Sequence, residues 1–205
     1  KNMSIVIGLT GPTGSGKSSA SRLAEDFGLQ VIDCDKTARE ATQKGTKGLN
    51  ALVSVFGEEI LLPDGSLNRK ALAAKAFKDK QSTDLLNRTI LPYIADLVIK
   101  QAVGRDTLLD APTLFESGIN KICNKTFAVL ADRDIRLKRI IARDNLTLKE
   151  AETRINAGKD EEFYRERADY VLYNNGDENA FLKRFSDILK EITGGNLQCQ
   201  KNRNQ

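Results

Sequence analysis

Residues 8–19, GLTGPTGSGKSS, follow a short apolar run, SIVIGL, at residues 4–9. Residues 11–18 fit the pattern G-x-x-x-x-G-K-[ST], and the apolar run before them predicts a strand. Glycines let a loop fold into a concave nest of backbone N–H groups, and the start of a following helix adds the positive end of its dipole. The stretch therefore predicts a site for the phosphates of a nucleoside triphosphate, at a turn between a strand and a helix.

The residues after the glycines have chemistry that suits the same site. Lys17 can reach the outer phosphates, and the Ser18 hydroxyl can bind a magnesium ion. Apolar residues then recur with helical spacing, from Ala20 through Leu23 and Ala24 to Phe27, which predicts a helix ending at Gly28. The predicted contacts to the nucleoside triphosphate in this stretch are Gly11, Pro12, Thr13, Gly14, Ser15, Gly16, Lys17, Ser18 and Ser19.

Outside the loop, short apolar runs alternate with amphipathic helical patterns, which is typical of α/β proteins built around a parallel sheet. The segment at 36–104 is mostly helical and longer than a direct crossover needs, so it predicts a helical insertion. A charged helical block at 134–167 and an amphipathic helix at 181–192 precede a polar tail at 193–205, which we expect to be flexible. The candidate strands are 4–9, 29–33, 107–111, 126–131 and 170–174.

The composition is that of an ordinary globular protein. With 205 residues, 40% of them hydrophobic, the chain can bury one sizeable core. Its net charge of +4 is mild and suits an anionic small molecule as easily as a nucleic acid. Cys34, Cys123 and Cys199 form no CxxC pair, so we expect reduced thiols in a cytoplasmic protein. Because no apolar run is long enough to span a bilayer, we expect no membrane partner.

Two carboxylates, Asp33 and Asp35, stand at the end of the second candidate strand. Ligands of open α/β sheets bind at the carboxyl ends of strands, and in an extended segment both side chains point to one side, toward the loop. The chain has no histidine, so a carboxylate is the candidate for the base or positioning group of a kinase. The alternative is a turn or N-cap before a helix. Asp110, at the end of the third candidate strand, can orient a magnesium ion or serve as an N-cap.

Three arginines, Arg136, Arg139 and Arg143, recur with helical spacing and predict one basic helix face. Arginines that close over a moving phosphoryl group stabilise its negative charge, so this face can belong to a kinase site. A solvated face with little energetic effect is the alternative, and the spacing alone does not decide between them.

Several stretches together resemble the dephospho-coenzyme A kinase family, in an order that runs from residue 4 to about residue 190. The glycine-rich loop is shared by many enzymes, whereas this combination is specific. The other stretches are VIDCD at 31–35, DGSLNRKAL at 64–72, LLNRTILP at 85–92, DAPTLFE at 110–116, LKRIIARD at 137–144 and ADYVLYNNG at 168–176.

The resemblance implies a P-loop kinase fold: a parallel sheet flanked by helices, a helical substrate-binding insertion and a mobile lid. It also implies that ATP, with Mg²⁺, phosphorylates the ribose 3′-hydroxyl of dephospho-coenzyme A to give coenzyme A and ADP. We expect no nucleic-acid partner, and a monomer or small homo-oligomer. The implied parts are a nucleotide-binding core at 1–35 and 105–192, with a lid at about 136–167, and an acceptor-binding insertion at 36–104.

The resemblance also implies roles for individual residues. Asp35 would be the catalytic carboxylate near the 3′-hydroxyl, with Asp33 beside it. Lys17 would act on the phosphates and Arg139 would be the lid arginine. The remaining implied roles are Arg143 and Asn175 in ATP binding, Arg69 and Asn87 with Asp35 in acceptor binding, and Ser18 and Asp110 in the metal site.

Three other functions remain open from the residues alone. A shikimate- or gluconate-type kinase also pairs a phosphate loop with an early acidic motif, although the long insertion favours a larger acceptor. A guanine-nucleotide switch usually carries Asn-Lys-x-Asp, whereas NKIC at 120–123 and NKTF at 124–127 lack the aspartate. An inactive ATP-binding module is disfavoured because Lys17, Ser18 and Asp35 are all intact.

Overall fold

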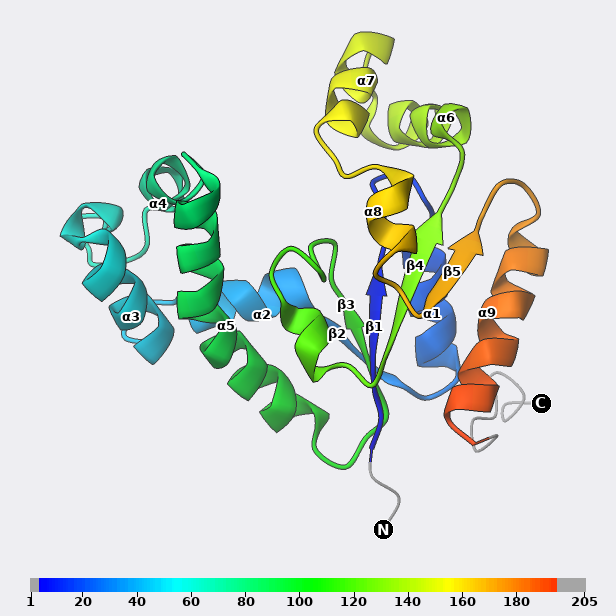
Figure 1. Ribbon diagram of the computed structural model, residues 1–205, viewed down its shortest axis with the longest axis horizontal. Helices are drawn as coiled ribbons and strands as arrows, with labels where there is room; N and C mark the ends of the chain where they lie inside the picture. The colour runs from blue at the N-terminus through cyan, green and yellow to red at the C-terminus, as the bar shows by residue number, and fades with distance from the viewer. Residues whose placement is uncertain (1–3, 195–205) are drawn as a thin grey trace.

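The computed structural model describes residues 4–194, and within them the strands form one five-stranded parallel sheet (Figure 1). The strand order is β2-β3-β1-β4-β5, so β1, which leads into the glycine-rich loop, lies at the centre. All five candidate strands are confirmed within two residues at each end. Their bounds are β1 Val6–Thr10, β2 Gln30–Asp33, β3 Thr107–Asp110, β4 Lys125–Leu130 and β5 Tyr170–Tyr173.

The helices surround this sheet and also form a group beside it (Figure 1). Many of them begin at a residue whose side chain accepts a backbone N–H bond from the first turn; Thr46, Asn68 and Asp79 cap three successive helices in this way. The bounds are α1 Lys17–Asp26, α2 Cys34–Ala41, α3 Lys47–Phe56, η1 Glu58–Ile60, α4 Arg69–Ala76, α5 Lys80–Ala102, η2 Ile119–Ile122, α6 Arg133–Asp144, α7 Leu148–Asn156, α8 Glu161–Arg165 and α9 Glu178–Ile192.

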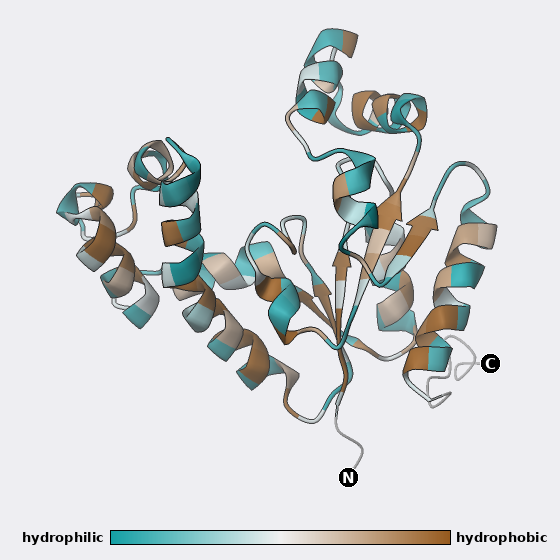
Figure 2. Ribbon diagram, viewed as in Figure 1, coloured by the Kyte–Doolittle hydropathy of each residue, from teal (hydrophilic) through white to brown (hydrophobic). Residues whose placement is uncertain are grey.

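One face of the sheet is covered by α1 and α9, whose apolar sides pack on the strands. The face expected for α1 is confirmed, because Ala20, Ala24 and Phe27 are buried and contribute to this cluster. Phe127 of β4 contacts Phe185 of α9 edge to face, with ring centroids 5.1 Å apart. In Figure 2, β4 and β5 are coloured as strongly apolar, as expected of strands covered by helices.

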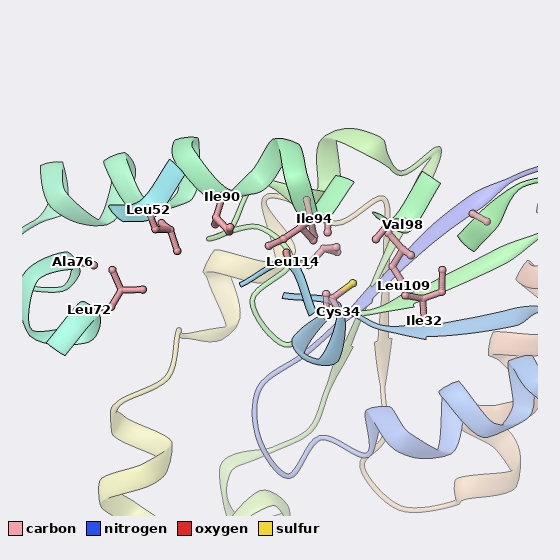
Figure 3. Close-up of a cluster of buried hydrophobic side chains, with 14 of the residues drawn as sticks. Ile32, Cys34, Leu52, Leu72, Ala76, Ile90, Ile94, Val98, Leu109 and Leu114 are labelled. Atoms are coloured by element: carbon pink, nitrogen blue, oxygen red, sulfur yellow. The ribbon is translucent and has the colours of Figure 1, made fainter. Parts of the chain in front are cut away.

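The second apolar cluster joins the helical insertion to the other side of the sheet (Figure 3). Ile94 and Val98 of α5 pack with Leu109 of β3 and with Cys34 at the start of α2. Farther along α5 the cluster continues into α3 and α4, so α5 ties the whole insertion to the sheet. The expected helical character of the insertion is confirmed.

The segment expected to form a lid contains α6, α7 and α8. Helices α6 and α7 have a small apolar cluster of their own and stand above the carboxyl ends of the strands in Figure 1. The boundaries of core, insertion and lid stay predictions. The tail at 193–205 is expected to be flexible. Its residues from 195 on, including Cys199, lie outside the described residues. Between residues 4 and 194, no helix has both the length and the apolarity of a membrane span.

Candidate active site

The glycine-rich loop joins β1 to α1, and two of its glycines occupy positions that a side chain cannot. Gly16, which caps α1, has φ 94°, and a Cβ there would lie 2.1 Å from Asn174 Nδ2. Gly11 has φ 153°, and its Cβ would lie 2.2 Å from the carbonyl oxygen of Val129. Glycine is required at both positions because a side chain would be strained and would also collide. The loop is thus fitted closely against the ends of β4 and β5.

The loop forms one wall of a cavity of about 710 Å³ above the start of α1. Helix α6 supplies the opposite wall through Arg139 and Arg143. The cavity therefore has glycine-loop backbone and a helix N-terminus on one side and two guanidinium groups on the other, which suits a polyphosphate. Of the nine residues expected to contact ATP in this stretch, Ser19 alone does not line the cavity; its hydroxyl donates to Glu178 on α9. The eight that do are Gly11, Pro12, Thr13, Gly14, Ser15, Gly16, Lys17 and Ser18.

Lys17 lies at the first position of α1, between the cavity and the edge of the sheet. Its ammonium donates to Asp110 Oδ1 at the end of β3, and the Ser21 hydroxyl donates to Asp110 Oδ2 at 2.6 Å. Burial lowers the pKa of Lys17, while the negative charges of Asp35 and Asp33 act against that change. The Lys17 side chain thus lies close to carboxylates, and Lys17 also lines the loop cavity.

Asp33 and Asp110 are brought together by strand register, because they face each other as Cα partners on β2 and β3. The expectation that residues 33–35 are extended is wrong: β2 ends at Asp33, and α2 begins at Cys34. Asp33 Oδ1 accepts the Lys36 N–H at 3.0 Å, so this residue does cap the helix. Asp35 lies exposed in the first turn of α2, close enough to affect the charge of Lys17. Both carboxylates therefore lie at the carboxyl edge of the sheet, in a different backbone conformation from the one expected.

The basic face of α6 is directed at the glycine-rich loop rather than at solvent. Arg136 Nε donates to the Thr13 carbonyl at 2.9 Å, and Arg139 Nη1 donates to the Ser15 carbonyl at 3.2 Å. The Arg143 guanidinium is more exposed and pairs with Asp144, although it lines the cavity. Arg136 belongs to the predicted basic helix face but had no predicted role in the site. Its contact with a loop carbonyl could not be found from the helical spacing of the arginines.

Asn174 is a site residue that belongs to the ADYVLYNNG stretch of the family resemblance but had no predicted role of its own. It is 3% exposed, its Nδ2 donates to the Ser15 carbonyl at 3.0 Å, and its Oδ1 accepts from Arg139 at 3.3 Å. The predicted ATP contact was the next residue, Asn175, which exchanges hydrogen bonds with Asp132 and does not line the loop cavity. Asn174 thus joins the loop, the α6 arginine and the end of β5.

The two residues expected on the acceptor side lie in different parts of the insertion. Arg69, at the start of α4, donates to the Thr42 hydroxyl at 3.2 Å and stays largely exposed. Asn87, on α5, donates to the Glu116 carbonyl at 2.8 Å and lines a second cavity, of about 600 Å³. The structure does not bring Arg69 and Asn87 to one cavity wall.

The residues expected to bind a magnesium ion offer oxygen ligands at or near the loop cavity. Ser18 lines the loop cavity and Asp110 lies behind Lys17, and hydroxyl and carboxylate oxygens are the ligands that Mg²⁺ prefers. Within residues 4–194, no group of three or more Cys, Asp or Glu side chains is arranged to hold a metal ion without other ligands. The residues fit an ion that arrives with the nucleotide's phosphates.

Comparison with known proteins identifies the family. A sequence profile described as dephospho-CoA kinase matches residues 5–179. This chain belongs to the dephospho-CoA kinase family. A dephospho-CoA kinase of Moorella thermoacetica is 38% identical over 182 residues, which cover 85% of this chain and 86% of the relative. One from Listeria monocytogenes is 35% identical over 93% of this chain and 98% of its own length.

Solved structures agree with the fold of the dephospho-CoA kinase family. The structure of TT1252 from Thermus thermophilus has a TM-score of 0.73 and 30% sequence identity, covering 96% of this chain and all of that one. A dephospho-CoA kinase from Campylobacter jejuni has a TM-score of 0.62 at 25% identity, with 94% and 98% coverage. Shikimate kinase from Acinetobacter baumannii has a TM-score of 0.52 at 19% identity, a likeness of fold alone.

These findings confirm the resemblance and the P-loop kinase fold read from the sequence. They also confirm the predicted activity, the phosphorylation of dephospho-CoA in the last step of coenzyme A synthesis, and they do not favour the shikimate-type alternative.

Proposed function

We propose that ATP binds in the loop cavity with its γ-phosphate toward Asp35, and that the acceptor ribose lies against that carboxylate. The observation that carries this proposal is the convergence of Lys17 with the carboxylates of Asp110, Asp33 and Asp35 beside the cavity. Parallel strands direct ligands to their carboxyl ends, and this is where all four groups gather. A kinase needs a phosphate cradle and a group for the acceptor hydroxyl in one place, and this edge supplies both.

In the proposed reaction, the acceptor 3′-oxygen forms a bond to the γ-phosphorus as the bond between that phosphorus and the bridging oxygen of ADP breaks. Asp35 accepts a hydrogen bond from the 3′-hydroxyl, orients its lone pair toward phosphorus and takes the proton. Lys17 and the loop amides stabilise charge on the phosphate oxygens. Arg139 and Arg143 face the same cavity from α6 and add positive charge over the transferring group.

In this proposal, hydrogen bonds join the loop, Arg139 and the end of β5. Arg139 is held at the loop through the carbonyl of Ser15 and the amide of Asn174. A guanidinium held in this way loses less freedom when it meets a phosphate. Ser18 and Asp110 would hold a Mg²⁺ ion bound with ATP, and the ion would neutralise phosphate charge and polarise the γ-phosphorus.

The compartment and assembly are also proposals. The Cys34 and Cys123 thiols are free and largely buried, as is usual in a reducing compartment, and we propose a cytoplasmic monomer or small homo-oligomer. Light scattering of the purified protein checks the assembly, and a mass clearly above a small oligomer would contradict it.

The test of the proposed function compares two acceptors under one set of conditions. Purified protein with ATP and Mg²⁺ is assayed for ADP release with dephospho-CoA and, separately, with shikimate. We expect a kcat/KM for dephospho-CoA at least about a thousandfold higher, because a site built for a large polar acceptor leaves groups unpaired around a small one. Comparable or faster turnover of shikimate would overturn the acceptor assignment.

A further inference from the structure

Ser21 lies on the buried side of α1, one helical turn after Lys17. It is 8% exposed, and its hydroxyl has two acceptors within reach: Asp110 Oδ2 at 2.6 Å and the Lys17 carbonyl oxygen at 3.4 Å. A hydroxyl has one proton to donate, and the shorter contact, to a charged acceptor, is the stronger of the two. Ser21 therefore donates to the carboxylate at the end of β3.

The Asp110 carboxylate is shared between two side chains of α1. Residues four apart on a helix lie on one face, so Lys17 and Ser21 both reach the end of β3. Lys17 donates to Oδ1 and Ser21 to Oδ2, and no other group in residues 4–194 donates to either oxygen. The side chains of Lys17 and Asp110 are 16% and 19% exposed, so water has little access to this contact. Two donors on different oxygens fix the rotation of the carboxylate.

A carboxylate fixed in this way leaves most of the Lys17 ammonium available. An ammonium has three N–H donors, and Asp110 engages it through one oxygen. Lys17 also lines the loop cavity, so its remaining N–H groups can meet phosphate oxygens there. Without the Ser21 hydroxyl, Oδ2 would lose its donor and be free to turn toward the same ammonium. A phosphate would then compete with both carboxylate oxygens for the N–H groups of Lys17.

We infer that Ser21 is a positioning residue for nucleotide binding: it holds Asp110 through Oδ2, so that Lys17 keeps two N–H groups free for the phosphates. Ser21 does not line the loop cavity and acts through Asp110 and Lys17. The inference rests on the proposed function, because it takes the loop cavity as the ATP site. Since the effect passes through the contact between Lys17 and Asp110, it should be present with and without Mg²⁺.

The test measures the binding of ATP to Ser21→Ala by calorimetry, once with Mg²⁺ and once with EDTA. We expect the dissociation constant for ATP to rise about tenfold in both conditions, because one charge-assisted hydrogen bond is lost. Ser21→Cys fills nearly the same space with a weak donor, so its affinity should also fall, by about fivefold or more. Circular dichroism confirms that each variant is folded.

A double-mutant cycle separates this role from a general effect on packing. Asp110→Asn removes the carboxylate charge and nearly keeps its shape. In that background Ser21→Ala should change the dissociation constant by no more than about twofold, because the ion pair that the hydroxyl holds is absent. Ser186→Ala is the matched control: Ser186 is 9% exposed, and its hydroxyl donates to the Lys183 carbonyl within α9, so ATP affinity should be unchanged.

Wild-type affinity for ATP in either Ser21 variant would overturn the inference, as would a loss that persists at full size in the Asp110→Asn background. A loss seen only with Mg²⁺ would also overturn it, since the hydroxyl would then act through the metal ion. If the wild-type protein itself binds no ATP in the presence of Mg²⁺, the proposed function has failed instead, so the two failures are distinguishable.

Discussion

At the scale of single residues, Lys17 is a half-buried cation of the site that lies close to three carboxylates. Its side chain is 16% exposed and donates to Asp110, while Asp33 and Asp35 oppose the lowering of its pKa by burial. Burial of an ammonium favours its neutral form and lowers the pKa of Lys17, whereas the negative charges of Asp35 and Asp33 favour the charged form. In the proposed reaction, Asp35, one of these carboxylates, also accepts the proton of the acceptor hydroxyl.

Replacing Lys17 with alanine removes this cation from the phosphate cavity. We expect kcat/KM to fall. The decrease should correspond to a loss of about 2–4 kcal/mol of transition-state stabilisation, as when one preorganised donor is removed. Steady-state kinetics with dephospho-CoA give the value, with Lys100→Ala as the control for charge on an exposed surface. Near-normal turnover of the Lys17 variant would contradict its assigned role.

The loop residues could be predicted from the sequence because their chemistry is local. Glycine spacing, a lysine and a serine between a strand and a helix specify the phosphate cradle without information on distant contacts. Asn174 could not be found in this way. Neighbouring side chains at a strand end point to opposite sides, so choosing between Asn174 and Asn175 required knowing which side faces the loop.

At the scale of elements, the end of β5 and the face of α6 meet at the loop. Arg136 and Arg139 donate to loop carbonyls, and Asn174 links Arg139 to Ser15. Sequence spacing predicted the basic face, but the partners are backbone oxygens far away along the chain, and only the fold brings them close. The start of α2 was likewise misjudged, because the strand ends one residue before the helix begins and no breaker separates them.

A pair of neighbouring asparagines tests this junction. Asn174→Ala should raise the KM for ATP about tenfold and lower the free energy of unfolding by about 1–3 kcal/mol, because it removes the buried amide that donates to the Ser15 carbonyl and accepts from Arg139. Asn175→Ala is the matched control: that residue is exposed and its side chain exchanges hydrogen bonds with Asp132, away from the loop cavity, so its effect should be small. Both are measured by kinetics and urea unfolding.

Equal effects of the two asparagine substitutions on the KM for ATP would show that the junction does not position the nucleotide. A larger effect of Asn175→Ala would instead support the direct ATP contact that the family resemblance implies for that residue.

At the scale of the whole molecule, two apolar clusters on opposite sides of the sheet hold the site at its carboxyl edge. The strands and the helical insertion followed from apolar periodicity, which is a local signal. The way in which α5 joins the insertion to the sheet could not be predicted from apolar periodicity, because it depends on long-range packing of Ile94 and Val98 with Leu109. The cluster also encloses Cys34, and Cys123 packs against it.

The stability of this packing should depend on alkaline pH. Burial raises the pKa of the Cys34 thiol, and of the Cys123 thiol, from 9.0 to about 12, and that of Tyr164 from 10.0 to about 12. Each group holds its proton more tightly in the folded chain, so its contribution to stability is complete below about pH 9 and is lost as the pH rises toward 12. Urea unfolding at several pH values should show the free energy of unfolding falling over this window.

The double variant Cys34→Ala/Cys123→Ala is the control for that pH dependence. It should be less stable at neutral pH, because it leaves small voids in the packed cluster, and its stability should fall less steeply above pH 9. An unchanged slope would mean that the two thiols do not titrate as described.

The most direct measurement of the central claim is the kcat of Asp35→Asn, taken together with its affinity for ATP. If the loop holds ATP and Asp35 handles the acceptor hydroxyl, kcat with dephospho-CoA should fall by about a hundredfold or more, with the ATP dissociation constant within about twofold of wild type. A kcat equal to wild type would contradict the account.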